Sequence, residues 1–428
     1  MPLQPGQRLE LAIEKPAAGG RMIARHDGQV ILVQGAIPGE RVIAAVERVE
    51  RQVAFASTVD LVSASPDRRS AHADPSCGGC SYAHIEYERQ VALKSEVISD
   101  AFTRLGRLPV QPPAVAPSPD RDYRMRARLH VRGDRVGFFR EGTHDLCDAA
   151  ATGQLTAASV EAAAECVSAL ARRGVSLSAI EIAENIAADQ RAAYVIPAAN
   201  SKLTDEVLDE ALKAAGLTGV SGLAADGLER TAGVPVVSDP LAVLTAGAVA
   251  AGALQRHAES FFQANRFLLP ALVGAVTAAV PADGAVLDLY AGVGLFSVAL
   301  AALGRRGITA VEGDRTSGRD LLRNATPFAE ALRISVGSVE QYLKRRGDRA
   351  ATIIVDPPRT GISREAMTAV VRAAAPTVVY VSCDPATMAR DARRLVDGGY
   401  ELSSLTAFDL FPNTPHVEAL GVFEARGK

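Results

Sequence analysis

A single cysteine stands where an apolar segment of the chain ends. Residues 378–382 read Val-Val-Tyr-Val-Ser, and Cys383, Asp384 and Pro385 follow directly. A run this rich in β-branched residues is typical of a buried strand in a parallel sheet, and ligands bind beyond the carboxyl ends of such strands. Because the thiol is strongly nucleophilic near neutral pH, Cys383 is a candidate for covalent catalysis. A buried structural cysteine is the alternative, since a lone cysteine often behaves as a small apolar residue.

A glycine-containing turn forms a second candidate site. Residues 286–296 read VLDLYAGVGLF, which predicts a strand through Asp288, a turn with Gly292 and Gly294, and then a helix. Glycines at such a turn let the backbone approach a ligand at a helix N-terminus. Glu312 ends the next expected strand, where an acidic side chain accepts hydrogen bonds from ribose hydroxyls. The third glycine of the dinucleotide fingerprint is missing and Asp288 suits a cationic ligand, so the pattern favours S-adenosylmethionine over NAD.

Two further carboxyl groups follow apolar segments. Asp356 ends an expected strand, and Pro357 and Pro358 hold the backbone rigid beyond it. Glu418 lies among apolar neighbours, where partial burial raises the pKa of a carboxyl group towards that of a general base. Each residue has a simpler interpretation. Asp356 precedes a proline, and Asp-Pro pairs are common in turns. Glu418 is alternatively a strand residue held in a salt bridge.

The elements that must position these residues fall into three regions. After residue 259, strands and helical segments alternate, which predicts a doubly wound parallel sheet. Residues 1 to about 60 contain short alternating strands between turn signals, typical of a small β-barrel, which either offers a face to oligonucleotides or is purely structural. The region between predicts mixed α and β elements. The strands expected after residue 259 are 285–289, 307–312, 352–356 and 377–382. The three regions are 1–62, 70–255 and 256–428, and a helix at about 87–105 of the central region is expected to pack on the C-terminal region.

Composition restricts the class of protein. The chain of 428 residues is 48% hydrophobic and 22% charged, as in ordinary globular proteins. Residues 1–15 lack the apolar stretch of a secretory signal, and the uncharged segment 241–254 is too short to span a bilayer, so we expect a cytoplasmic protein with no membrane partner. Five cysteines, an odd number, favour reactive or metal-binding thiols over a disulfide framework.

Arginines are concentrated in one short segment. The net charge of −3 gives no sign of nucleic acid, yet residues 121–140 contain seven arginines against two aspartates. Such clusters are often solvated strand faces, but they are also typical of phosphate-binding surfaces. The arginines are Arg121, Arg124, Arg126, Arg128, Arg132, Arg135 and Arg140.

Five motifs stand in a fixed order along the chain. They are SFFQAN (260–265), DLYAGVG (288–294), DPPR (356–359), SCDPAT (382–387) and FPNTPHVE (411–418). With Gly19-Gly20 and residues 37–40 (Ile-Pro-Gly-Glu) in the N-terminal barrel, they make nearly the whole chain resemble the S-adenosylmethionine-dependent RNA 5-methyluridine methyltransferases that carry a TRAM domain, most of all the members specific for 23S rRNA.

The resemblance implies a fold and a chemistry. The fold is α/β: a Rossmann-like class I methyltransferase domain, a small TRAM barrel resembling an OB fold, and a central α+β domain. Cys383 would attack C6 of uracil, Glu418 would remove the C5 proton, and Asp356 would hydrogen-bond the flipped base. The residues implied for S-adenosylmethionine are Gln263, Asp288, Tyr290, Gly292, Gly294, Glu312 and Asp356.

One departure from the family concerns a metal cluster. Many members hold a [4Fe–4S] cluster through four cysteines. Cys77 and Cys80 match the middle pair, whereas Ala71 and Thr152 occupy the outer positions and Cys147 lies nearby. Because four thiolates normally hold such clusters, we expect no cluster, with Cys77 and Cys80 as a relic pair or a weak metal site.

Several rival functions differ in what they require of the sequence. Familiar bacterial tRNA-specific relatives lack the barrel, so we expect 23S rRNA as the substrate, with the tRNA T-loop as the runner-up. A non-catalytic RNA-binding or chaperone protein on the same scaffold is less favoured, because Cys383 and Glu418 are both present. A small-molecule methyltransferase would need neither the barrel nor the arginines. No obligate protein partner is evident.

Overall fold

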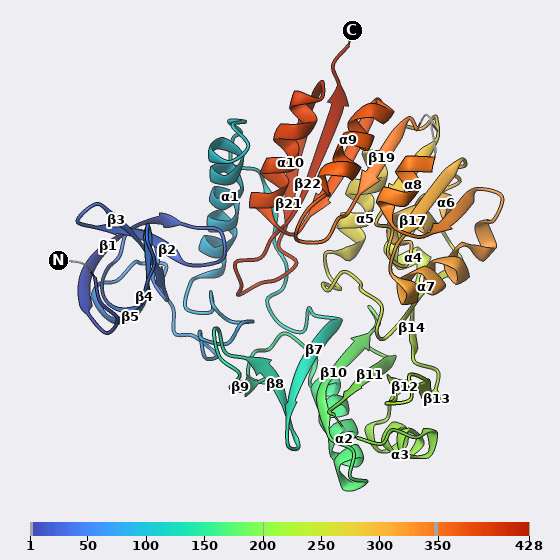
Figure 1. The fold of residues 1–428 in the computed structure, drawn as a ribbon, viewed down its shortest axis with the longest axis horizontal. Helices are drawn as coiled ribbons and strands as arrows, with labels where there is room; N and C mark the ends of the chain where they lie inside the picture. The colour runs from blue at the N-terminus through green and yellow to red at the C-terminus, as the bar shows by residue number, and fades with distance from the viewer. Residues whose placement is uncertain (1–2, 200, 346–349, 428) are drawn as a thin grey trace.

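Five strands near the N-terminus close into a small barrel, as predicted. The computed structural model describes residues 3–199, 201–345 and 350–427, so the outermost residues of the first and last regions lie outside it. The strands are β1 (Arg8–Pro16), β2 (Met22–His26), β3 (Gln29–Gln34), β4 (Arg41–Val49) and β5 (Val53–Ser63). They follow one another around the barrel in the order β1-β2-β3-β5-β4 (Figure 1). Alternate side chains of β1, such as Leu9 and Leu11, fill its interior, because successive residues of a strand point to opposite faces.

The C-terminal part is built on an eight-stranded sheet with the order β18-β17-β16-β19-β20-β22-β21-β6. The first five of these strands are mutually parallel, and β22 and β21 continue the sheet in antiparallel fashion. All four strands expected after residue 259 form. The strands are β6 (Val115–Ala116), β16 (Val286–Leu289), β17 (Ile308–Glu312), β18 (Leu332–Val336), β19 (Thr352–Val355), β20 (Thr377–Ser382), β21 (Tyr400–Phe408) and β22 (Glu418–Ala425).

Helices cover both faces of this sheet, because its strands are apolar on both sides. One face packs against α5 (Leu269–Ala278), α6 (Leu295–Ala302) and α7 (Arg315–Ala325), the last followed by a 3-10 turn at Thr326–Phe328. The other packs against α8 (Val339–Arg345), α9 (Arg364–Ala373) and α10 (Pro385–Asp397). Within β19, Ile354 belongs to the first core and Ile353 to the second, as strand alternation requires. The doubly wound α/β architecture is therefore confirmed.

A seven-stranded sheet with the order β13-β12-β11-β10-β7-β8-β9 forms the central part. Helices α2 (Ala157–Arg172) and α3 (Asp205–Ala215) share its apolar core. Its strands are β7 (Arg126–Arg132), β8 (Arg135–Phe139), β9 (Leu146–Asp148), β10 (Leu177–Glu184), β11 (Arg191–Pro197), β12 (Gly219–Leu223) and β13 (Glu229–Gly233). A two-stranded ribbon, β14 (Val236–Pro240) and β15 (Ala253–His257) with α4 (Leu241–Leu244) between them, leads on to the C-terminal part.

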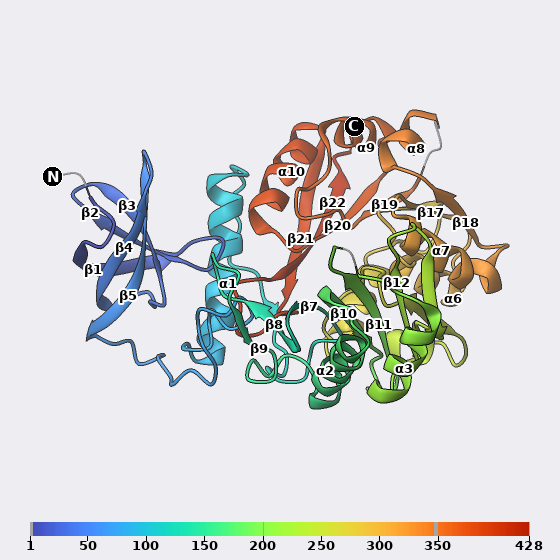
Figure 2. The same ribbon diagram turned by 60° about the horizontal axis from the view of Figure 1, so that its bottom comes forward.

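Helix α1 (Tyr87–Arg104) stands between the barrel and the C-terminal sheet in both views (Figures 1 and 2). Its Leu93 belongs to the barrel core, whereas Ile98 and Phe102 pack with α9, α10 and the sheet. The helix expected at about 87–105 to pack on the C-terminal region is α1, and it lies on the C-terminal sheet together with β6. In the described part of the chain, no helix has the length and apolarity needed to cross a bilayer.

Candidate functional site

A pocket of about 730 Å³ opens at the carboxyl ends of β17, β19 and β20. This is where ligands bind in open α/β sheets. It gathers seven of the residues singled out from the sequence: Gln263, Tyr290, Gly292, Glu312, Asp356, Cys383 and Glu418. It also takes side chains from the central part of the chain, namely Arg124 and Arg126.

The register of two antiparallel strands brings Cys383 and Glu418 together. Ser382, the last residue of β20, pairs with Ala419 of β22. Cys383 follows Ser382, and Glu418 precedes Ala419, so the thiol and the carboxyl group extend the ladder by one position and both line the pocket. Two residues that lie far apart in the sequence are thus fixed on one wall by backbone pairing.

Cys383 lies just before the N-terminus of α10. Asp384 caps this helix by accepting a hydrogen bond from the backbone N–H of Thr387 at 2.7 Å, and Pro385 occupies its first turn. Burial raises the pKa of the Cys383 thiol to about 11, with a further upward contribution from Glu418 and an opposing one from Arg359. The positive end of the helix dipole and Arg359 are the groups here that favour the thiolate.

Asp356 follows β19 and faces Gln263 across the pocket. Gln263 Nε2 donates a hydrogen bond of 3.1 Å to Asp356 Oδ2. Burial raises the pKa of Asp356 to about 7, against the lowering effect of Gln263. Burial and the charge of Asp356 raise the pKa of Glu418 well above its usual range, while Arg359 opposes them. Buried carboxyl groups of this kind suit proton transfer near neutral pH.

The other end of the pocket has the features of a nucleoside site. Glu312 ends β17 and accepts hydrogen bonds from the backbone N–H of Gly292 and of Asp314, both at 2.6 Å. Each carboxylate oxygen keeps lone pairs for further donors such as ribose hydroxyls. Tyr290 has a positive φ of 62°, so the turn after β16 holds a residue in a strained conformation beside the pocket.

Two of the residues implied for the cofactor, Asp288 and Gly294, are not among the described residues that line the pocket, and their part in cofactor binding stays a prediction. Asp288 is fully buried within β16, and neither of its carboxylate oxygens has a hydrogen-bond partner in the described part of the chain. Gly294 begins α6 with a φ of 96°, and a Cβ there would come within 2.8 Å of Leu321 and Val298. Close packing at the start of α6 therefore requires the glycine at position 294.

The cysteines near the N-terminus lie outside the pocket. Cys77 forms a disulfide with Cys147, with their Cα atoms 6.0 Å apart. Cys80 is buried beside them with a free thiol, and its Sγ lies 3.9 Å from the carbonyl oxygen of Thr152. The expectation of thiols without disulfides is thus wrong for Cys77 and Cys147. Cys77 lies in the loop after the barrel and Cys147 in β9, and the two segments pack together. Among the described residues, no group of three or more His, Cys, Asp or Glu side chains is arranged to hold a metal ion.

Sequence reasoning missed several pocket residues. Arg124 lies between the rings of Phe138 and Phe411 and donates to Gln154 Oε1 at 2.7 Å, while Arg126 pairs with Glu181. They belong to the arginine-rich segment, whose charge had suggested only an outer surface. Phe261 and Phe411 come from the SFFQAN and FPNTPHVE motifs, and Arg359 ends DPPR. Position in a motif was the available signal for these three.

The chain is similar to known protein families and to several relatives along nearly its whole length. The family description "tRNA (Uracil-5-)-methyltransferase" matches residues 341–426, and "TRAM domain" matches residues 2–59. An uncharacterized RNA methyltransferase of Streptomyces avermitilis is 32% identical, with 99% of each chain covered. The 23S rRNA (uracil(1939)-C(5))-methyltransferase RlmD of Pseudomonas putida is 33% identical, with 98% of this chain and 94% of the relative covered.

A solved structure shares the fold over most of the chain. The tRNA (uracil-54, C5)-methyltransferase of Pyrococcus abyssi, in complex with S-adenosyl-L-homocysteine, superimposes with a TM-score of 0.75 and covers 96% of this chain and 99% of its own. At 23% sequence identity, this likeness concerns the fold.

Proposed function

Because the chain belongs to the RNA uracil-C5 methyltransferases, which use S-adenosylmethionine as methyl donor, we propose that it methylates C5 of a uridine in 23S rRNA through a covalent bond to Cys383. The observation that carries the mechanism is the strand register that sets Cys383 and Glu418 side by side on one pocket wall. The relatives named as 23S rRNA enzymes are 31–33% identical over nearly their full length, against 23% for the tRNA enzyme of known structure, which supports this substrate over tRNA. With such a substrate, we expect the protein to act in the cytoplasm.

In the proposed reaction, the Cys383 thiolate adds to C6 of the uracil ring and makes C5 nucleophilic. S-adenosylmethionine supplies an electrophilic methyl group, which C5 accepts. Glu418 then takes the proton from C5, the C6–S bond breaks, and the electron pair of that bond returns to Cys383. The raised pKa of Glu418 suits this step, because a stronger base removes a carbon-bound proton more readily.

The remaining pocket residues divide between base and cofactor. Asp356, held by Gln263, is placed to hydrogen-bond the uracil edge after the base leaves its stack. Glu312 and the turn at Tyr290 and Gly292 provide the adenosine end of the cofactor site. The cysteine region does not fit a [4Fe–4S] cluster, since Cys77 is paired with Cys147 and the outer family positions hold Ala71 and Thr152. No step is assigned to such a cluster.

The test offers protein-free 23S rRNA and unmodified tRNA in parallel, with labelled S-adenosylmethionine. We expect 5-methyluridine in the rRNA, a denaturation-resistant adduct with 5-fluorouridine-containing RNA, and loss of both with Cys383→Ala, while cofactor binding is retained. Glu418→Gln should still methylate but accumulate the covalent complex with natural RNA. Turnover by Cys383→Ala would refute the mechanism, and methylation of tRNA alone would refute the substrate.

A further inference from the structure

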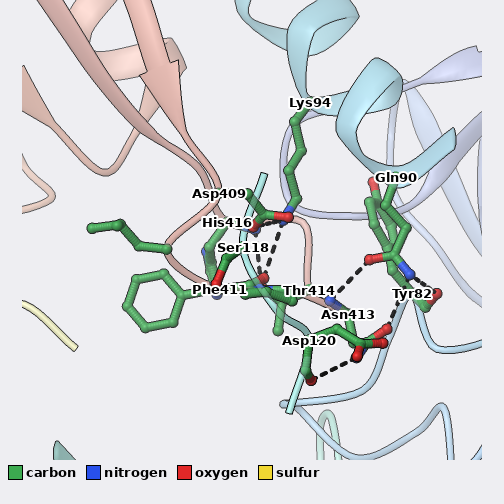
Figure 3. A network of polar contacts seen from close by, with 12 residues as sticks. Tyr82, Gln90, Lys94, Ser118, Asp120, Asp409, Phe411, Asn413, Thr414 and His416 are labelled. Atoms are coloured by element: carbon green, nitrogen blue, oxygen red, sulfur yellow. Dashed lines mark hydrogen bonds and ion pairs between the residues drawn. The ribbon is translucent and has the colours of Figure 1, made fainter. Parts of the chain in front are cut away.

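The loop between β21 and β22, residues 409–417, carries Phe411 into the pocket and ends at Glu418. It is a loop by secondary structure, yet Asp409, Asn413 and Thr414 are almost fully buried. A buried loop must satisfy its backbone polar groups within the protein. Figure 3 shows two of the side chains that do so, Gln90 and Lys94 of α1. Asn265 and Tyr123 donate to the carbonyl oxygens of Leu410 and Pro412 from other segments.

Lys94 of α1 holds the start of this loop. Its ammonium group pairs with Asp409 Oδ1, and the side chains of the pair are 1% and 0% exposed. The same Nζ donates to the carbonyl oxygen of Phe411 at 3.1 Å (Figure 3). Tyr87 OH donates to Asp409 Oδ2 at 3.1 Å. Lys94 thus bonds directly to the backbone of a residue that lines the pocket.

Gln90, one helical turn earlier, holds the middle of the loop. Gln90 Oε1 accepts from the backbone N–H of Asn413 at 2.9 Å, and Gln90 Nε2 donates to Asn413 Oδ1 at 3.0 Å (Figure 3). The backbone N–H of Tyr82 donates to the Asn413 carbonyl at 2.9 Å. Asn413 has a φ of 61°, a conformation that asparagine tolerates better than most residues. The α1 side therefore fixes both the main chain and the side chain at this bend.

Cys383 is anchored differently. It lies between β20 and the capped N-terminus of α10, and α10 packs against the C-terminal half of α1 as well as against β21 and α9. Among the described residues, the side chains of Lys94 and Gln90 form hydrogen bonds with the 409–417 loop and with residues 82 and 85, and none with residues 382–387. The β20–β22 pairing holds both the nucleophile and the base, but the hydrogen bonds of Lys94 and Gln90 reach only the loop that leads into the base.

We propose that Lys94 and Gln90 are positioning residues that hold the 409–417 loop and, through it, Glu418 in place for removal of the C5 proton. This inference rests on the proposed function. It assigns α1 a task in one chemical step: loss of its contacts slows proton removal and product release, while addition of Cys383 and methyl transfer proceed. A displacement of about 1 Å at a catalytic group is enough to cost on the order of 100-fold in rate.

The experiment separates the two steps in full-length Lys94→Met. Formation of the adduct with 5-fluorouridine-containing RNA requires addition and methyl transfer but no removal of a C5 proton, whereas turnover on natural RNA requires all three. We expect adduct formation near the wild-type rate, turnover reduced by about 10- to 100-fold, and a covalent complex that accumulates with natural RNA as in Glu418→Gln. Arg104→Met is the matched control, because Arg104 lies on the same helix, pairs with Asp100 and is 56% exposed. It should leave both rates unchanged.

If Lys94 has a merely structural role, Lys94→Met should lower the rate of adduct formation and the rate of turnover together, in proportion to the folded fraction. Either that result or an unchanged turnover would overturn the inference. Removing one partner of a buried ion pair can unfold a protein. Tyr87→Phe therefore serves as the milder variant, since it takes one hydroxyl from the same carboxylate and keeps the ring. We expect the same division between the steps, with a smaller loss of turnover. If wild-type protein neither forms the adduct nor methylates RNA, the proposed function itself has failed.

Discussion

Asp356 and Glu418 bring two carboxyl groups to one pocket, and each is harder to ionise than in water. Burial is the largest cause for both, and the charge of Asp356 adds to it at Glu418. A ligand that carries a positive charge offsets this cost, because an opposite charge nearby favours the ionised form of a carboxyl group. S-adenosylmethionine has a sulfonium charge, whereas S-adenosylhomocysteine has a neutral thioether. The two ligands therefore report on the charge of the pocket.

We predict that affinity for S-adenosylmethionine rises between pH 6 and pH 8, whereas affinity for S-adenosylhomocysteine changes much less. With a pKa of about 7, Asp356 is mostly neutral at the lower pH and mostly ionised at the higher one. Its ionised fraction grows by up to about tenfold over this range, which sets the largest effect from this one group. Calorimetric titration measures both ligands, and Asp356→Asn should flatten the difference. Parallel pH profiles in the wild type would contradict the assignment.

The elements differ in how far the sequence could predict them. Strands β16, β17, β19 and β20 are apolar on both faces, so their composition alone marks them as central parallel strands. Strand β18 was missed, because it lies at the sheet edge and alternates with exposed Arg333. Edge position explains β6 as well: its two residues lie in a proline-rich segment, where no periodicity is visible.

Local sequence patterns likewise identified only some residues of the candidate site. Cys383 and Asp356 follow recognisable strands, so local pattern found them. Glu418 was recognised only from the order of the five motifs along the chain. Strand register, not closeness in sequence, sets it beside Cys383. Arg124 enters the pocket from the segment just before β7, and Lys94 acts from α1, which precedes that segment in the chain. Contacts between distant segments of this kind leave no local signal.

The segment that contains Cys77 and Cys80 offers no pair of free, reactive thiols to a metal cluster. Burial raises the pKa of Cys80 to about 12, so this thiol is unreactive, and Cys77 is tied to Cys147. Protein purified anaerobically should lack the broad brown absorbance of an iron–sulfur cluster. Alkylation after denaturation should modify three cysteines without reductant and all five with it. About four iron and four sulfide per chain would contradict this expectation.

Taken as a whole, the molecule has a net charge of −3, so attraction to RNA must come from local surfaces. The arginine-rich segment supplies one of them in part: Arg128 and Arg132 are exposed on the outer face of β7, whereas Arg124 and Arg126 turn into the pocket and Arg140 pairs with Asp74. The barrel supplies another candidate surface. Its core includes side chains of the segment before α1 and of α1 itself, so removal of the barrel would uncover the helix that supports the catalytic loop. Substitution on the surface is therefore a cleaner test than deletion.

Replacing Arg128 and Arg132 together with glutamine should weaken RNA binding without changing affinity for S-adenosylmethionine, because both side chains lie outside the cofactor end of the pocket. If each neutralises one phosphate, the slope of log affinity against log salt should become shallower by roughly 1.4 to 1.8. Filter binding across a range of salt concentrations measures this slope. Arg172→Gln with Arg173→Gln removes the same charge at the end of α2 and should leave the slope unchanged. An equal loss of RNA affinity in both double variants would show that RNA binding depends on overall charge rather than on β7. An unchanged slope in the Arg128 and Arg132 variant would show that this face of β7 does not bind RNA.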